Sequence, residues 1–181
     1  MVDPGIWSEP EALLRADAVL LTHEHTDHAD LLRIAGSGLP VWAPSGADLR
    51  GIPFHPVEPG GEVSVAGFTV RAVGGRHARV LPEQDTCPNL GYVIDTSAGA
   101  LYHPGDALTL PTERVHTLLV PLQASWLKTA EAVEFARSVG PQRAIGIHDG
   151  QVNRRAIASI GRWLTEFGCA AYRSVEPGSQ I

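Results

Sequence analysis

The stretch VLLTHEHTDHADLL, residues 19–32, decides what fold and chemistry to expect of this chain. It places His23, His25, Asp27 and His28 between two apolar runs. Residues two apart in an extended segment point the same way, so His23 and His25 can present their imidazoles to one point just past a strand. Asp27 and His28 then stand at the entry of the next helix and can face a neighbouring point. This spacing could serve two metal ions rather than one.

The composition suits one globular domain spanning residues 1–181, because 44% of the 181 residues are hydrophobic. The net charge of -6 gives no broad attraction for nucleic acid or an anionic membrane. Cys87 and Cys169 form no CxxC, so any metal must be held by His and carboxylates. No apolar run reaches the ~18 residues of a membrane span and no signal peptide is evident, so we expect a cytoplasmic protein.

Short apolar runs alternate with turn signals and a few amphipathic segments, a mixture that predicts an α/β (α+β) fold of sheets covered by helices. The segment 76–89 has no periodicity and is expected to be a long loop. Thr129 and Gly140 are the expected caps of one helix. The expected strands are 18–22, 39–44, 116–122, 143–150 and 169–175, the hairpins turn at 66–67 and 96–99, and the helices are 29–36, 129–140 and 152–168.

Three further residues can complete a metal centre. Four ligands are too few for two ions, since a catalytic site needs about three protein ligands per metal and an open position. His77, Asp106 and His148 each lie at the end of an expected strand or the start of a loop.

Each candidate also has an ordinary structural interpretation. A lone His is usually a hydrogen-bonded group and an Asp after Gly is usually a turn residue, so the three distant residues are weak when taken singly. The clustered residues 23–28 are different, because several His at a helix entry have no capping role of their own. His55, His103 and His116 lie within or beside expected strands and are expected to be structural.

Taken together and in this order, THEHTDH, His77, the Gly-Asp at 105–106 and His148 resemble the metal motifs of the metallo-β-lactamase superfamily of metal-dependent hydrolases. VDPG at 2–5 is similar to the strand that precedes the first motif in that family. The resemblance covers essentially the whole chain. It is greatest to the lactonase-like branch, which includes ascorbate-phosphate lactonase and many bacterial hydrolases.

The resemblance implies a four-layer αββα sandwich of two mixed sheets, with two divalent metal ions in a cleft at one edge. Zinc is expected first, with manganese or iron as alternatives. The family's usual N-terminal strand hairpin is expected to be missing, which would leave a sheet edge through which copies of the chain could associate. The implied ligands are His23, His25 and His77 for one metal, Asp27, His28 and His148 for the other, and Asp106 as the bridge.

The implied function is hydrolysis of a small-molecule lactone, ester or phosphoester by metal-activated water, with Asp27 as the catalytic residue that holds the hydroxide and accepts its proton. Glu24, Asp30 and Asp149 are candidates to orient the imidazoles, by proximity in sequence alone. Two alternatives stay open. One is a nucleic-acid phosphodiesterase or nuclease, against which the acidic charge counts, and the other is a metal-binding protein without turnover.

The sequence does not identify the substrate-binding residues. Arg76 and Arg79 flank His77 and could receive an anionic substrate or simply be solvated. Trp126 could form a cleft wall or pack against its neighbours.

Overall fold

The computed structural model describes residues 1–179 and divides their strands between two sheets. The smaller sheet is parallel throughout, in the order β1-β2-β3, and the larger is mixed, in the order β10-β9-β8-β7-β6-β5-β4. The small sheet consists of β1 (Val19–Leu20), β2 (Val41–Pro44) and β3 (His55–Val57). The large sheet consists of β4 (Glu62–Val65), β5 (Phe68–Arg76), β6 (Pro88–Thr96), β7 (Gly99–His103), β8 (Thr117–Pro121), β9 (Arg143–Ile147) and β10 (Tyr172–Arg173).

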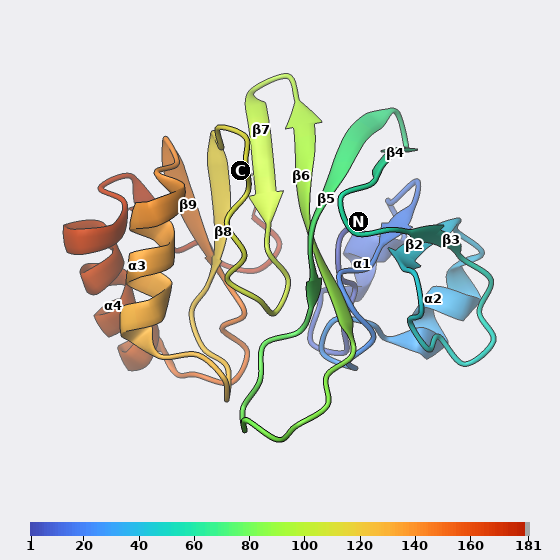
Figure 1. Ribbon diagram of the computed structural model, residues 1–181, viewed down its shortest axis with the longest axis horizontal. Coiled ribbons are helices and arrows are strands. Elements are labelled where there is room, and N and C mark those ends of the chain that lie inside the picture. The colour runs from blue at the N-terminus through green and yellow to red at the C-terminus, as the bar shows by residue number, and fades with distance from the viewer. Residues whose placement is uncertain (180–181) are drawn as a thin grey trace.

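The two sheets and their helices form four layers. Helices α3 (Thr129–Val139) and α4 (Arg154–Trp163) cover one side of the large sheet, while the small sheet and α2 (Leu31–Ser37) lie on the other (Figure 1). Separate apolar clusters fill the three spaces between these layers. The expected αββα arrangement is therefore confirmed. No helix among residues 1–179 combines the length and the apolar character needed to cross a membrane.

Strand β6 shows how the sequence builds the central layers. Successive side chains of a strand point to opposite faces, and both Tyr92 and Val93 are fully buried. Val93 belongs to the cluster under the helices and Tyr92 to the cluster between the sheets. The Tyr92 hydroxyl donates a hydrogen bond to the Leu21 carbonyl, 2.9 Å away, and burial raises its pKa. This bond ties the large sheet to the end of β1.

Two boundaries differ from the sequence-based expectation. Thr129 is wrong as the N-cap of α3: it is the first helical residue, and Lys128 precedes it with its backbone N–H donating to Glu131 Oε2 at 2.8 Å. Gly140 is confirmed as the C-cap, with a left-handed φ of 60°. The long loop is shorter than expected and spans residues 77–87, because β5 and β6 extend into the predicted 76–89 segment.

The N-terminal segment runs beside β1 at the edge that was expected to be unpaired. Val2 forms a parallel bridge with Leu20, and the Asp3 N–H donates to the Leu20 carbonyl at 3.0 Å. Gly5 then touches the backbone of the His-rich loop, since a Cβ at this position would lie 1.7 Å from the Asp27 carbonyl oxygen. Residues 2–5 are thus packed directly against the metal motif.

We predict that Gly5→Ala lowers the free energy of unfolding by at least about 2 kcal/mol, because the added methyl overlaps the Asp27 backbone. Gly36→Ala is the matched control: it lies in α2 with nothing within 4 Å of the added Cβ, and alanine favours a helix by about 0.5–1 kcal/mol. Urea denaturation of both variants measures the difference. Equal stability of the two variants would contradict the packing described for residues 2–5.

Candidate metal centre

The structure brings all seven predicted site residues to one edge of the sandwich. Four come from the loop that joins β1 to α2, and the other three directly follow or closely follow β5, β7 and β9. They form two groups, and within each group the potential ligand atoms lie within 4.8 Å of one another. The first group is His23, His25 and His77, and the second is Asp27, His28 and His148, with Asp106 between them.

The geometry of the first group suits one ion. His23 Nε2 lies 3.1 Å from His25 Nδ1, and the His77 ring centroid is 4.9 Å and 4.7 Å from those of His23 and His25. Two nitrogens bound tetrahedrally to zinc at about 2.0–2.1 Å are about 3.3 Å apart. The separation of the His23 and His25 nitrogens is close to this value.

Asp106 faces both groups with different oxygens. Its Oδ1 lies 3.2 Å from His28 Nε2 and 3.4 Å from His148 Nε2, whereas Oδ2 lies 3.4 Å from His77 Nε2. Burial opposes ionisation, but the ion-pair contacts with His148, His28 and His77 outweigh it and hold the pKa of Asp106 well below its ordinary value. A carboxylate placed in this way can bridge two cations.

Trp126 and Asn89 fix the position of Asp106. The Trp126 indole N–H donates to Asp106 Oδ2 at 2.9 Å, and the Asp106 backbone N–H donates to Asn89 Oδ1 at 2.9 Å. Asn89 is buried, and its side-chain amide in turn donates to the Pro104 carbonyl. The sequence left the role of Trp126 open between cleft wall and packing, and the structure makes it a hydrogen-bond donor to the central carboxylate.

Four of the five histidines are held through Nδ1, so that Nε2 faces the interior of the site. An oxygen partner on Nδ1 fixes the orientation of an imidazole and leaves its other nitrogen available as a ligand. His25 is turned the other way, with Nδ1 toward His23. The oxygen partners are the Thr22 hydroxyl for His23, Asp3 for His28, the Ala78 carbonyl for His77 and the Gln123 carbonyl for His148.

The unpaired polar atoms also converge here. Among residues 1–179, six buried side-chain nitrogens and oxygens have no hydrogen-bond partner, and four of them are His28 Nε2, His77 Nε2, His148 Nε2 and Asp106 Oδ1. Leaving such an atom unpaired costs about 1–3 kcal/mol, so native proteins rarely tolerate it without a reason. Imidazole and carboxylate donors grouped in this way fit divalent metal ions.

The carboxylates of the site favour positive charge on the groups beside them. Burial opposes protonation of both His28 and His148. The nearby carboxylates, Asp106 and Asp3 for His28 and Asp106 and Asp27 for His148, outweigh it and raise both pKa values to about 10. The contact with His148 is the main cause that lowers the pKa of Asp27 to about 2. The carboxylates thus create a negative potential that suits a divalent cation.

Asp3 orients the site, and the sequence-based choice of orienting residues was wrong. Asp3 Oδ2 accepts hydrogen bonds from His28 Nδ1 at 2.8 Å and from the Thr22 hydroxyl at 2.6 Å, and Oδ1 accepts one from the Thr22 backbone N–H at 2.7 Å. The Thr22 hydroxyl in turn lies 3.0 Å from His23 Nδ1. The VDPG segment was the available signal, but it was interpreted only as a strand.

The three carboxylates chosen from sequence have other roles, and within the described part of the chain none hydrogen-bonds to a site imidazole. Glu24 accepts a hydrogen bond from the Asp48 backbone N–H at 2.7 Å. Asp30 caps α2 and pairs with Arg33. Asp149 lines the cavity beside His148 without contacting its ring nitrogens.

The neighbouring loop residues are tied to their own loop. Arg76 donates to the Thr86 carbonyl and Arg79 to the Pro82 carbonyl, and both of these bonds are exposed. Cys87 Sγ lies 3.8 Å from His25 Nε2, a proximity that the sequence did not indicate. Burial raises the pKa of this thiol to about 11, so it is protonated at neutral pH rather than present as a thiolate.

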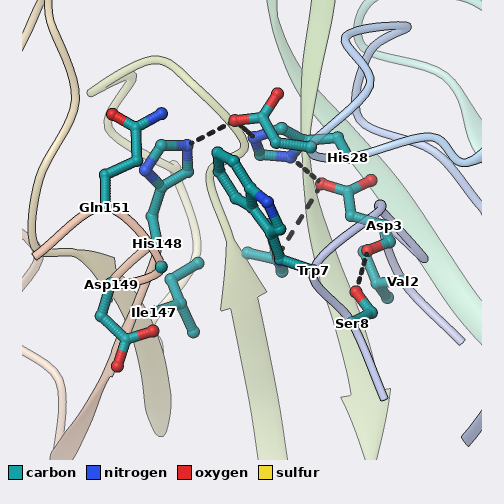
Figure 2. A pocket seen from close by; sticks show the side chains of 12 residues that line it. Val2, Asp3, Trp7, Ser8, His28, Ile147, His148, Asp149 and Gln151 are labelled. Carbon is teal, nitrogen blue, oxygen red and sulfur yellow. Dashed lines mark hydrogen bonds and ion pairs between the residues drawn. The ribbon is translucent and has the colours of Figure 1, made fainter. Parts of the chain in front are cut away.

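A cavity of about 270 Å³ opens beside the second group of ligands. Asp27, His28 and His148 line one part of it, and Trp7 lies across its middle (Figure 2). His103 also lines the cavity; it is buried, and its Nδ1 accepts a hydrogen bond from the Gly105 N–H at 3.1 Å. This hollow gives a small molecule access to the candidate metal centre.

We predict that Asp3→Asn weakens metal binding by about 10–100-fold, because an amide has one acceptor oxygen and its NH2 group would face a donor, either the Thr22 backbone N–H or His28 Nδ1 and the Thr22 hydroxyl. Asp149→Asn serves as the control and should change the affinity by less than about twofold. Competition with a chromophoric chelator measures both affinities, after circular dichroism has verified that each variant is folded. An equal loss in the two variants would show that Asp3 has no special orienting role.

Comparison with known proteins identifies the family of this chain. Residues 1–148 match the family described as the beta-lactamase superfamily domain. Protein Rv0786c of Mycobacterium tuberculosis is 39% identical over 190 residues, covering 100% of this chain and 90% of that protein. The UPF0173 metal-dependent hydrolase TV0864 of Thermoplasma volcanium is 28% identical over 169 residues, covering 82% of this chain and 74% of its own length.

A solved structure has the same fold. Igni18, a metallo hydrolase from Ignicoccus hospitalis, superposes with a TM-score of 0.72 at 20% identity, covering 99% of this chain and 85% of that chain. The greater similarity to the lactonase-like branch stays a prediction. The match over residues 1–148 and the similarity to the mycobacterial protein show that this chain belongs to the β-lactamase superfamily.

Proposed function

We propose that this protein is a metal-dependent hydrolase in which two divalent ions activate water against a small-molecule lactone, ester or phosphoester. The observation that carries the proposal is the position of Asp106, whose two oxygens face two separate groups of ligands. Hydrolysis is supported by the relative from Thermoplasma volcanium, which is named a metal-dependent hydrolase, and by the fold shared with the metallo hydrolase Igni18.

Each ion has its own set of ligands in this proposal. His23, His25 and His77 hold one ion, and Asp27, His28 and His148 hold the other, with Asp106 shared. Zinc is the first choice, although imidazole and carboxylate also accept manganese and iron. When bound, two such ions would lower the pKa of a water toward ~7 and would polarise the carbonyl or phosphoryl oxygen of a substrate, which makes its carbon or phosphorus more electrophilic.

Asp27 is the catalytic residue of this proposal. Its side chain keeps 22% of its surface exposed, compared with 6% for Asp106, so it is the more accessible of the two carboxylates. With a pKa of about 2 it is ionised at neutral pH, so its carboxylate can hold attacking water by accepting a hydrogen bond from it. Uptake of the proton by the same carboxylate is part of the proposal. The 3.4 Å contact with His148 Nε2 holds Oδ2 at the cavity that the substrate enters.

A small substrate fits this surface better than a nucleic acid. The chain carries a net charge of -6, and none of the residues lining the cavity is Lys or Arg. Nucleic-acid enzymes hold the phosphate backbone with basic patches. We therefore rank a nuclease below a small-molecule hydrolase.

The two site groups provide the direct test of function. We expect the double variant His23→Ala, His148→Ala to lose bound metal and at least about 99% of its turnover, since it removes one ligand from each group. The matched control is His55→Ala, His116→Ala, because these imidazoles contact Trp42 and Thr117 instead. Each protein is reconstituted with zinc, manganese or iron and assayed on a γ-lactone, an aryl ester and bis(p-nitrophenyl) phosphate. Equal activity in the two double variants would refute the proposal, and bound metal with no turnover would favour a binding protein.

A second variant isolates Asp27. Asp27→Asn should lower kcat/KM by about 10²–10⁴-fold, the usual contribution of a positioned proton acceptor, while an amide oxygen can still contact a metal. Asp85→Asn, an exposed carboxylate in the loop 77–87, should leave kcat/KM unchanged. Metal content is measured on the same samples. A loss of activity that only follows a loss of metal would make Asp27 a ligand without a role in proton transfer.

A further inference from the structure

Trp7 is an exposed aromatic side chain at the entrance of the site. Although 56% of its surface is exposed, it lines the same cavity as Asp27, His28 and His148. Figure 2 shows its indole in the middle of the view of this cavity, which His28 and His148 also line. The ring also lies close over Gly150, where an added Cβ would be 3.1 Å from Trp7 Cε3. Trp7 is therefore an exposed residue outside the apolar core.

The backbone that carries Trp7 is held firmly. The Arg33 guanidinium donates to three carbonyls of residues 5–8 at distances of 2.9 to 3.1 Å, and its Nε pairs with Asp30. The Ile6 N–H donates to the Thr26 carbonyl at 3.0 Å, which joins this loop to the His-rich loop. A large aromatic surface on a fixed backbone loses little entropy when it binds a ligand. Trp7 is thus preorganised for contact with a bound molecule.

The side chains that line the cavity offer an anionic substituent no Lys or Arg partner. Three of the lining residues are carboxylates, Asp3, Asp27 and Asp149, and none is Lys or Arg. Arg33, the cation that holds the Trp7 loop, is not among the lining residues and is already paired with Asp30. Apart from the site imidazoles and the metal ion that they would hold, the lining offers no cationic side chain with which an anionic substituent packed on the indole could pair. Val2 and Ile147 add apolar surface beside the indole.

We infer that Trp7 is a specificity-determining residue, on which an uncharged alkyl or aromatic substituent of the substrate packs while its scissile bond lies at the metal groups. The inference rests on the proposed function and narrows its substrate class to lactones or esters with an apolar, non-anionic substituent. Each methylene that packs against the indole in the transition state should lower the activation free energy. We therefore expect kcat/KM to rise with the length of the substituent.

Methyl esters of acetic, butyric and hexanoic acid, together with monomethyl adipate, test this inference on the metal-reconstituted protein. In the wild type we expect kcat/KM to rise about threefold per methylene, and the adipate monoester to be hydrolysed at least tenfold less efficiently than the hexanoate ester. Trp7→Ala should remove most of the hexanoate-to-acetate ratio. The control Trp163→Ala removes a similarly exposed indole, which stacks on Phe167 in the α4 region, and should keep the ratio.

A binding measurement separates failure of this inference from failure of the proposed function. The indole N–H resonances of ¹⁵N-labelled protein are titrated with hexan-2-one and with acetone, neither of which can be hydrolysed. We expect the Trp7 resonance to shift, with a Kd for hexan-2-one at least fivefold below that for acetone, while the Trp163 resonance stays in place. If neither these esters nor the γ-lactone, aryl ester and bis(p-nitrophenyl) phosphate are hydrolysed, the proposed function fails, and this titration still tests Trp7. An unmoved Trp7 resonance, a hexanoate-to-acetate ratio that Trp7→Ala leaves intact, or a preference for the adipate monoester would each overturn the inference.

Discussion

The pairing of the buried Asp3 carboxylate is the constraint on which the site depends. A buried carboxylate must be fully hydrogen-bonded, and Asp3 meets this requirement with the backbone and hydroxyl of Thr22 and with the imidazole of His28. These bonds join the segment beside β1 to both ends of the His-rich loop. The Thr22 hydroxyl also lies 3.0 Å from His23 Nδ1 and orients that imidazole. Gly5 permits the close approach, because any side chain there would meet the Asp27 backbone.

The remaining ligands depend on how the two sheets are stacked. Tyr92 ties β6 to the carbonyl of Leu21, just before the motif, and so sets the large sheet against the small one. The ends of β5, β7 and β9 then bring one candidate ligand each to the same edge. Trp126 and Asn89 hold Asp106 between the groups. The cluster keeps buried polar atoms unpaired, a cost that the apolar clusters between the four layers must offset.

Much of this arrangement could be predicted from the sequence, because the spacing of residues along the chain indicates it. The H-x-H-x-D-H string indicates the candidate ligands of one loop directly. The alternation of strands and helices predicts sheets covered by helices, whereas the αββα order came from the resemblance to the metallo-β-lactamase superfamily. The roles of Asp3 and Trp126 could not be predicted, since each acts on a partner 25 or 20 residues away through tertiary packing. Thr129 was mistaken for a cap because the Glu131 side chain, rather than a threonine hydroxyl, binds the backbone at the start of α3.

The central claim is that seven side chains hold two metal ions with Asp106 between them. Anomalous diffraction from crystals of the metal-loaded protein, recorded on both sides of the metal absorption edge, tests it most directly. The account predicts two peaks per chain about 3.5–4 Å apart, one among His23, His25 and His77 and the other among Asp27, His28 and His148. A single peak, or peaks away from Asp106, would contradict it.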